Sequence, residues 1–117
     1  MTIENSLFQG RIASGATIYV PVPIRNGALG VHIGWPDAVS SATITLELSS
    51  RDGIAVTVAG TGDQWFDSLV VIVGPAASAA GSAPVNVENC RQRLARLKIV
   101  TAAVTTLDIR DGTGPGL

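Results

Sequence analysis

The chain has very few of the residues that most enzymes use for chemistry. Its 117 residues include one cysteine and one histidine. One cysteine excludes an intrachain disulfide and fits a reducing compartment, and a single Cys with a single His is too few for a zinc cluster. A nucleophile activated by histidine would need His32, which lies in a segment of alternating apolar residues. We interpret His32 as a partly exposed strand residue or a subunit contact, and we expect neither metal nor cofactor.

Charges and long apolar runs are also scarce. Charged residues make up 15% of the chain and the formal net charge is -1, so no overall field attracts nucleic acid or an anionic membrane. No uncharged apolar stretch approaches the length of a membrane span. Residues 1–13 lack a signal-peptide pattern, because Glu4 and Asn5 stand where a basic and then an apolar run would be needed. These features predict a soluble protein that begins its life in the cytoplasm.

The residues that are abundant favour β-structure. Val, Ile, Leu and Ala dominate a hydrophobic fraction of 46%, whereas Lys and Glu are scarce. Short apolar segments with period-two alternation are separated by Gly, Pro, Asn and Ser turn signals. Pro21 and Pro23 share one face of such a segment, which predicts a strand at a sheet edge because proline cannot donate to a ladder. The expected strands are residues 7–13, 17–24, 28–35, 43–48, 54–58, 65–73, 93–101 and 104–110.

About eight short strands without a convincing helix predict an all-β fold. We expect a single-domain antiparallel β-sandwich, with the jelly roll favoured and a closed barrel as the nearest alternative. The expected boundaries are an N-terminal arm at 1–6, the sandwich domain at 7–111 and a flexible tail at 112–117. Residues 74–84 consist of Gly, Ala, Ser and Pro, which predicts a flexible or extended connection.

The last third of the chain predicts a hairpin. Its two β-forming runs, 93–101 and 104–110, meet at the short junction Ala102-Ala103. The alternation of the first run places Arg96 and Lys98 on the outer face and leaves Arg93 near the rim. A helix from Cys90 to Val100 capped by Asn89 is a competing interpretation. The β-branched residues near the end of that segment favour the strand.

No constellation of carboxylates specifies a reaction. Asp52 and Asp111 both occur in Arg-Asp-Gly, where turn formation accounts for them. Asp63, Asp67 and Glu47 could meet in space and supply the two carboxylates of a glycosidase-like hydrolase, although no spacing rule supports it. Gly-Thr-Gly at 60–62 precedes a strand and not a helix, so it is a poor phosphate cradle. The sequence therefore favours a protein that is not an enzyme.

Cations and tryptophans supply the candidate contact residues. Arg91, Arg93, Arg96 and Lys98 form one basic cluster, which we interpret as an interfacial ion-pair region or a solvated face. A nucleic-acid site would carry interleaved aromatic residues, and this cluster has none. An exposed Trp can stack on a sugar or anchor a subunit contact, and a buried one can close an end of the sandwich. The expected interface residues are Trp35, Trp65, Arg91, Arg96 and Lys98.

Several segments resemble a family of virion proteins. The segments are Gly27 to Trp35, the alternating A-T-I-T-L-E-L-S at Ala42 to Ser49, the Trp-bearing loop at Asp63 to Trp65, and R-x-R-L-A-R-L-K-I-V-T-A-A-V-T-T-L-D-I at Arg91 to Ile109. Together they are similar to small β-sandwich proteins in the virions of tailed bacteriophages. The chain has no coiled-coil heptads or repeats of the kind that mark a complete fibre or spike.

The resemblance implies a capsid decoration or cement protein, or else the base of a head spike or an adhesion module of a tail. Its partners would be the major capsid protein or other virion proteins, and its location would be the virion after assembly in host cytoplasm. We expect a homo-oligomer, with a trimer favoured, and no binding to nucleic acid or membrane. The alternative is a carbohydrate-binding or receptor-adhesion module of a head spike or tail that holds a glycan on Trp35 or Trp65.

Overall fold

The computed structural model describes residues 6–37, 40–51, 53–60, 64–67, 80–88 and 90–112. These residues contain strands and no helix, and every strand pair is antiparallel. The all-β prediction is therefore confirmed. The strands are β1 (Ser6–Ile12), β2 (Thr17–Val22), β3 (Leu29–Trp35), β4 (Ala42–Ser49), β5 (Phe66–Asp67), β6 (Gly81–Val87), β7 (Leu94–Thr101) and β8 (Thr105–Asp111).

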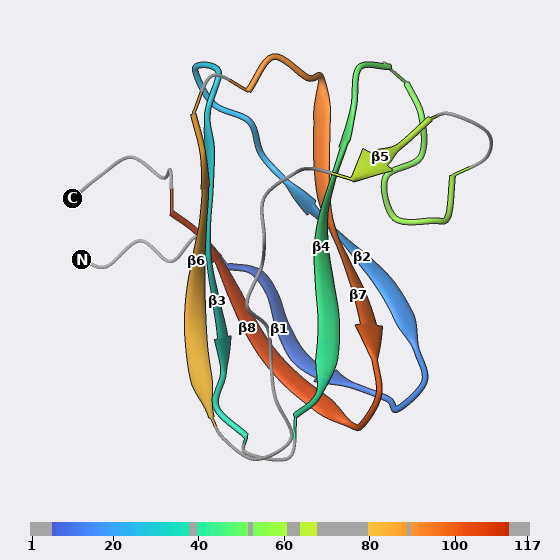
Figure 1. Ribbon diagram of the computed structural model, residues 1–117, viewed down its shortest axis with the longest axis vertical. Coiled ribbons are helices and arrows are strands. Elements are labelled where there is room, and N and C mark those ends of the chain that lie inside the picture. The colour runs from blue at the N-terminus through green and yellow to red at the C-terminus, as the bar shows by residue number, and fades with distance from the viewer. Residues whose placement is uncertain are drawn as a thin grey trace.

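The strands form two four-stranded sheets that face each other (Figure 1). Sheet I has the order β1-β8-β3-β6, and sheet II has the order β2-β7-β4-β5. The first strand pairs with the last, the second with the seventh, the third with the sixth and the fourth with the fifth. This nested order is that of a jelly roll, which confirms the predicted sandwich and replaces the closed-barrel alternative.

The core lies between the sheets and follows the period-two alternation of the strands. In β3, Leu29, Val31, Ile33 and Trp35 are buried while His32 between them is exposed. Leu46, Leu97 and Ile99 are likewise buried on the inner face of sheet II, because alternate side chains of a strand point to opposite faces. The buried apolar residues are Ile12, Val20, Val22, Leu29, Val31, Ile33, Trp35, Ile44, Leu46, Leu48, Ala83, Val85, Cys90, Ala95, Leu97, Ile99, Leu107 and Ile109.

The predicted hairpin in the last third is wrong, although both of its strands exist. β7 belongs to sheet II and β8 to sheet I, so the short link between them crosses from one sheet to the other. The carbonyl of Ser41 accepts hydrogen bonds from the amides of Ala102 and Ala103 at 2.9 and 3.3 Å, which stabilises the crossing. The competing helix from Cys90 to Val100 is also wrong, because Leu94–Thr101 is the strand β7.

Two expected segments take another form. The connection expected at 74–84 contains the start of β6, which pairs with β3 along its whole length. Pro84 is accommodated because β6 is an edge strand, as is β2 with Pro21. Residues 53–60 lie outside any strand, although 54–58 was expected to form one. Of the strand expected at 65–73, the structure describes β5, and residues 68–73 lie outside the described part.

The ends of the expected domain differ slightly from the prediction. Ser6 was assigned to an arm and is the first residue of β1. Gly112 was assigned to the tail, and its amide donates to the carbonyl of Gly30 at 2.7 Å. The rest of the expected arm and tail, residues 1–5 and 113–117, lies outside the described residues.

Candidate functional site

Arg96 is the centre of the most organised group of polar side chains on sheet II. It lies on β7 between the core residues Ala95 and Leu97, so its side chain points to the outer face of the sheet. Only 2% of its surface is exposed. Of the two interpretations given for the basic cluster, the solvated face is therefore wrong for Arg96. Its outward direction is correct, but other parts of the chain cover it.

Two aromatic rings and one carboxylate enclose the guanidinium. The rings of Tyr19 and Trp65 each lie 3.9 Å from its central carbon, measured to the ring centroid. Nε donates to Oε1 of Glu47 at 2.7 Å. Glu47 stands opposite Arg96 in the β4–β7 register, and Tyr19 comes from β2 on the other side of β7. The ion pair and the cation–π contacts thus join three neighbouring strands.

The same guanidinium holds residues 53–60 across the outer face of sheet II. Nη1 donates to the carbonyl oxygens of Val56 and Val58 at 3.0 and 2.7 Å. Gly60 lets the Trp65 ring approach, because a Cβ at that position would stand 2.5 Å from Cδ1 of the indole. Arg96 therefore fixes a segment that has no strand partner of its own.

A polar hollow of about 230 Å³ lies at this cluster, and we call it the Arg96 hollow. Residues 59 and 60 and both aromatic rings form part of its wall. Lys98, two residues along β7, is half-buried and brings a second cation. The hollow is lined by Tyr19, Glu47, Ala59, Gly60, Trp65, Arg96 and Lys98.

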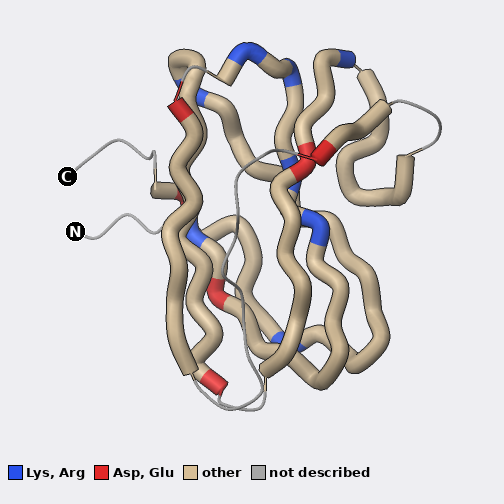
Figure 2. The backbone as a smooth tube through the Cα atoms, viewed as in Figure 1, with Lys and Arg blue, Asp and Glu red and all other residues tan. Residues whose placement is uncertain are grey.

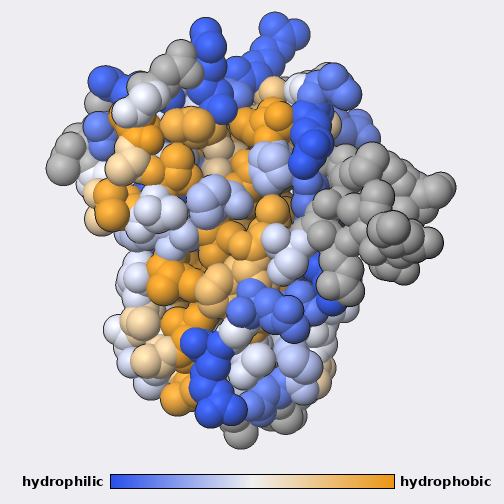
Figure 3. Space-filling view, turned by 180° about the vertical axis from the view of Figure 1, so that it is seen from behind, coloured by the Kyte–Doolittle hydropathy of each residue, from blue (hydrophilic) through white to orange (hydrophobic). Residues whose placement is uncertain are grey.

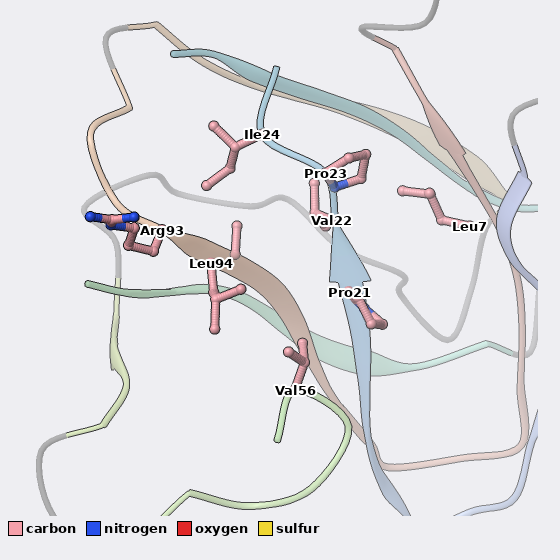
Figure 4. A pocket seen from close by; sticks show the side chains of 9 residues that line it. Leu7, Pro21, Val22, Pro23, Ile24, Val56, Arg93 and Leu94 are labelled. Carbon is pink, nitrogen blue, oxygen red and sulfur yellow. The ribbon is translucent and has the colours of Figure 1, made fainter. Parts of the chain in front are cut away.

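A second hollow, of about 450 Å³, lies beside β2, and we call it the β2 hollow. Apolar side chains from both sheets and from Val56 surround it, with Arg93 at one side (Figure 4). Arg93 precedes β7, in agreement with its predicted place at the rim. The hollow is lined by Leu7, Pro21, Val22, Pro23, Ile24, Val56, Arg93, Leu94 and Ala95.

The structure separates the five residues expected at an interface. Trp65, Arg96 and Lys98 come together at the Arg96 hollow. Trp35 is 6% exposed and lies over Gly81 of β6, so it is a core residue in this chain. Arg91 precedes β7 in the chain and is exposed. Figure 2 shows the charged residues dispersed over the molecule.

The remaining candidates are distributed over both sheets. His32 is exposed on β3, opposite Pro84, and the Cys90 thiol is buried. Asp111 forms an ion pair with Arg25 at 3.1 Å, which gives it a role beyond the turn that was predicted for it. Glu47 and Asp67 are partners in the β4–β5 register, but the Glu47 carboxylate already binds Arg96. Asp52 and Asp63 lie outside the described residues.

Sequence reasoning missed both hollows, because each combines residues that are far apart in the chain. Among the described residues, no group of three or more His, Cys, Asp or Glu side chains is arranged to hold a metal ion. In the same part of the chain, no helix has the length and apolar character needed to cross a bilayer. No family model, no curated protein and no solved structure matches the chain.

Proposed function

We propose that this protein is a non-enzymatic structural protein of a phage virion, of the capsid decoration or cement type. It stabilises the head by bridging neighbouring capsid subunits. The jelly-roll sandwich and the sequence resemblance both support this proposal. The observation that carries it is the incomplete cover of the hydrophobic core along β1 and β2, the adjoining edges of the two sheets.

Partly buried apolar residues gather at that edge. Five of the seven that pack against the core fall within residues 7–24, and the β2 hollow opens there as well. Figure 3 shows apolar residues along the middle of the face seen from behind, between hydrophilic margins. Apolar surface of this kind is typical of a face that another protein covers. The five residues, which we call the edge band, are Leu7, Phe8, Ala16, Ile18 and Ile24.

The occupant of the edge band is a second copy of the chain within a homo-oligomer, with a trimer favoured. Symmetry repeats each contact, so an oligomer that touches several capsid subunits gains strength by multivalency even when each contact is modest. The bridges oppose the outward pressure of packaged DNA. In this arrangement the major capsid protein is the partner of the assembled oligomer.

The capsid role is tested with particles that lack the protein. Purified protein is added to empty capsids, and both binding and capsid heat resistance are measured. We expect saturable binding and a higher disruption temperature. If the protein fails to bind and heat resistance is unchanged, the capsid role is wrong.

The edge band is tested separately by sedimentation. Pro21→Asp places a charge at the exposed wall of the β2 hollow and is expected to shift the oligomer toward monomer. Thr43→Asp places the same charge at an exposed position on β4 and serves as the matched control. Equal association of both variants and the unmodified chain would contradict an interface at this edge.

A carbohydrate-binding or adhesion module is the second candidate. The observation that favours it is the pair of aromatic rings, Tyr19 and Trp65, in the wall of a polar hollow on a sheet face. Trp35 gives it no support, because its ring is buried. A glycan array separates the two functions, since a decoration protein gives no signal there and an adhesion module does.

A further inference from the structure

The Arg96 hollow contains hydrogen-bond donors that the described residues do not satisfy. Nε and Nη1 of Arg96 have acceptors in Glu47, Val56 and Val58, but no described residue accepts from Nη2. Nε1 of Trp65 is buried and likewise has no acceptor in the described part of the chain. A desolvated donor without an acceptor costs free energy. Both residues line the hollow, and the cost applies to Nε1 of Trp65, which is the donor of the two that is buried.

The charges of the hollow fit an occupant with a single negative charge. Arg96 and Lys98 bring two positive charges and Glu47 brings one negative charge, which leaves one positive charge in excess. A carboxylate balances this excess and offers two acceptor oxygens for guanidinium, ammonium and indole N–H groups. A dianionic phosphate would exceed it and would stand beside the Glu47 carboxylate.

The size and rigidity of the hollow also suit a small acid. Its volume of about 230 Å³ exceeds that of one water molecule, which takes about 30 Å³ in the liquid. Arg96 cannot turn away, because two rings and three hydrogen bonds hold it. A donor that is fixed before binding loses little conformational entropy when the ligand arrives.

We propose that the Arg96 hollow binds the carboxylate group of a small monoanionic molecule, through Nη2 of Arg96 and the ammonium of Lys98, beside the buried indole N–H of Trp65. This inference does not rest on the capsid role, since it concerns a ligand of the Arg96 hollow and makes no use of the edge band. A free organic acid and a sugar acid share the recognised group. The experiment below separates these two sources.

The test follows the indole N–H resonances by NMR during titration at constant ionic strength. The probes are acetate, glucuronate, glucose and the neutral isostere acetamide. We expect acetate and glucuronate to shift the Trp65 resonance saturably, and acetamide and glucose to leave it unchanged. The second tryptophan, Trp35, is an internal control because it lies in sheet I, away from the hollow. Tighter binding of glucuronate than of acetate would identify a sugar acid as the ligand, and the reverse order a simple organic acid.

Lys98→Met provides the decisive variant, because it removes one of the two cations and retains an unbranched side chain that is only one atom shorter. We expect the affinity for acetate to fall about tenfold or more. Arg91→Met, an exposed cation outside the hollow, is the matched control and should bind acetate like the unmodified protein. The proposal is overturned if the Trp65 shift is linear in acetate concentration, if acetamide reproduces it, or if Lys98→Met binds acetate unchanged.

Discussion

At the scale of single residues, Arg96 is the side chain that connects β7 with several other parts of the chain. Its guanidinium contacts β2 and β4, the Trp65 ring and the carbonyl oxygens of residues 56 and 58. A charge that is 98% removed from water is tolerated because an opposite charge and several acceptors surround it. Removing such a residue lowers the free energy of unfolding mainly because its buried partner charge is then left uncompensated.

Arg96→Met is expected to reduce the free energy of unfolding by about 3–5 kcal/mol, because it leaves the Glu47 carboxylate buried without its partner. Denaturant unfolding measures this loss. The double variant Arg96→Met/Glu47→Met should recover part of it, since no uncompensated charge remains.

The matched control for Arg96→Met is Arg110→Met. The Arg110–Asp108 pair is partly exposed to solvent, and exposed pairs contribute about 0–1 kcal/mol. If the two Arg→Met variants lost similar stability, the structural role assigned to Arg96 would be refuted.

Gly81 offers a second test at the residue scale. A Cβ at this position would stand 2.9 Å from Cζ2 and 3.0 Å from Nε1 of the buried Trp35 ring, closer than side chains normally approach. Gly81→Ala is therefore expected to cost about 1–3 kcal/mol in thermal or denaturant unfolding. Ser82→Ala, at the next and exposed position of β6, should change stability by less than about 0.5 kcal/mol. A neutral Gly81→Ala would show that the ring moves aside freely.

The burial of single residues could be predicted where alternation decides it. The sequence places Leu97 and Ile99 inward and Arg96 and Lys98 outward, and the structure agrees on these directions. The sequence does not reveal that Arg96 is covered, because the residues that cover it are distant along the chain. Tyr19, for example, precedes Arg96 by 77 residues. The alternation of apolar and polar residues shows to which face of a sheet a side chain points, but it does not show which other residues cover that face.

At the scale of elements, the crossing from β7 to β8 organises one end of the sandwich. Thr101 and Thr105 flank the crossing, and both are buried. The Thr101 hydroxyl lies 2.6 Å from the carbonyl of Ala13, and the Thr105 hydroxyl lies 3.1 Å from the carbonyl of Ser41. These threonines satisfy backbone groups of two other turns, which allows the chain to change sheets without burying unpaired polar atoms.

Thr105→Val tests this arrangement with a side chain of nearly the same shape. The amide of Ser41, which donates to the Thr105 hydroxyl at 3.2 Å, would lose its acceptor. We expect a loss of about 1–3 kcal/mol in the free energy of unfolding. Thr106→Val, on the opposite face of β8, is the control and should be close to neutral. Equal effects of both variants would contradict a special role for the buried hydroxyl.

Strand existence was easier to predict than strand pairing. The runs at 93–101 and 104–110 match β7 and β8, but their short junction suggested a hairpin because local turn chemistry favours adjacent pairing. β8 pairs instead with β3 and with β1, and the Ser6–Arg110 register joins residues more than a hundred positions apart. Such pairing depends on which faces bury apolar surface together, and no short window of sequence contains that information.

At the scale of the whole molecule, the nested strand order makes almost every contact long-range. β4 and β5 are the only described strands that are neighbours both along the chain and within a sheet. All other sheet pairs close large loops before they gain contacts, which slows folding.

We therefore expect single-domain refolding on a timescale of milliseconds to seconds or slower, measured by stopped-flow fluorescence of the tryptophans. Microsecond refolding would be inconsistent with this topology. The contacts of Arg96 join strands that are distant in sequence. The folding and unfolding rates of Arg96→Met, compared with those of the unmodified protein, show whether these contacts form before or after the folding transition state.

The pairing of the first strand with the last has a consequence for engineering. Ser6 stands beside Arg110 in sheet I, so the chain enters and leaves the sandwich at neighbouring points. A short linker could join these points, and new termini could be opened in an exposed turn such as Ser14-Gly15 to give a circular permutant. For the same reason, the sandwich could be inserted into a surface loop of a host protein without forcing the two sides of that loop apart.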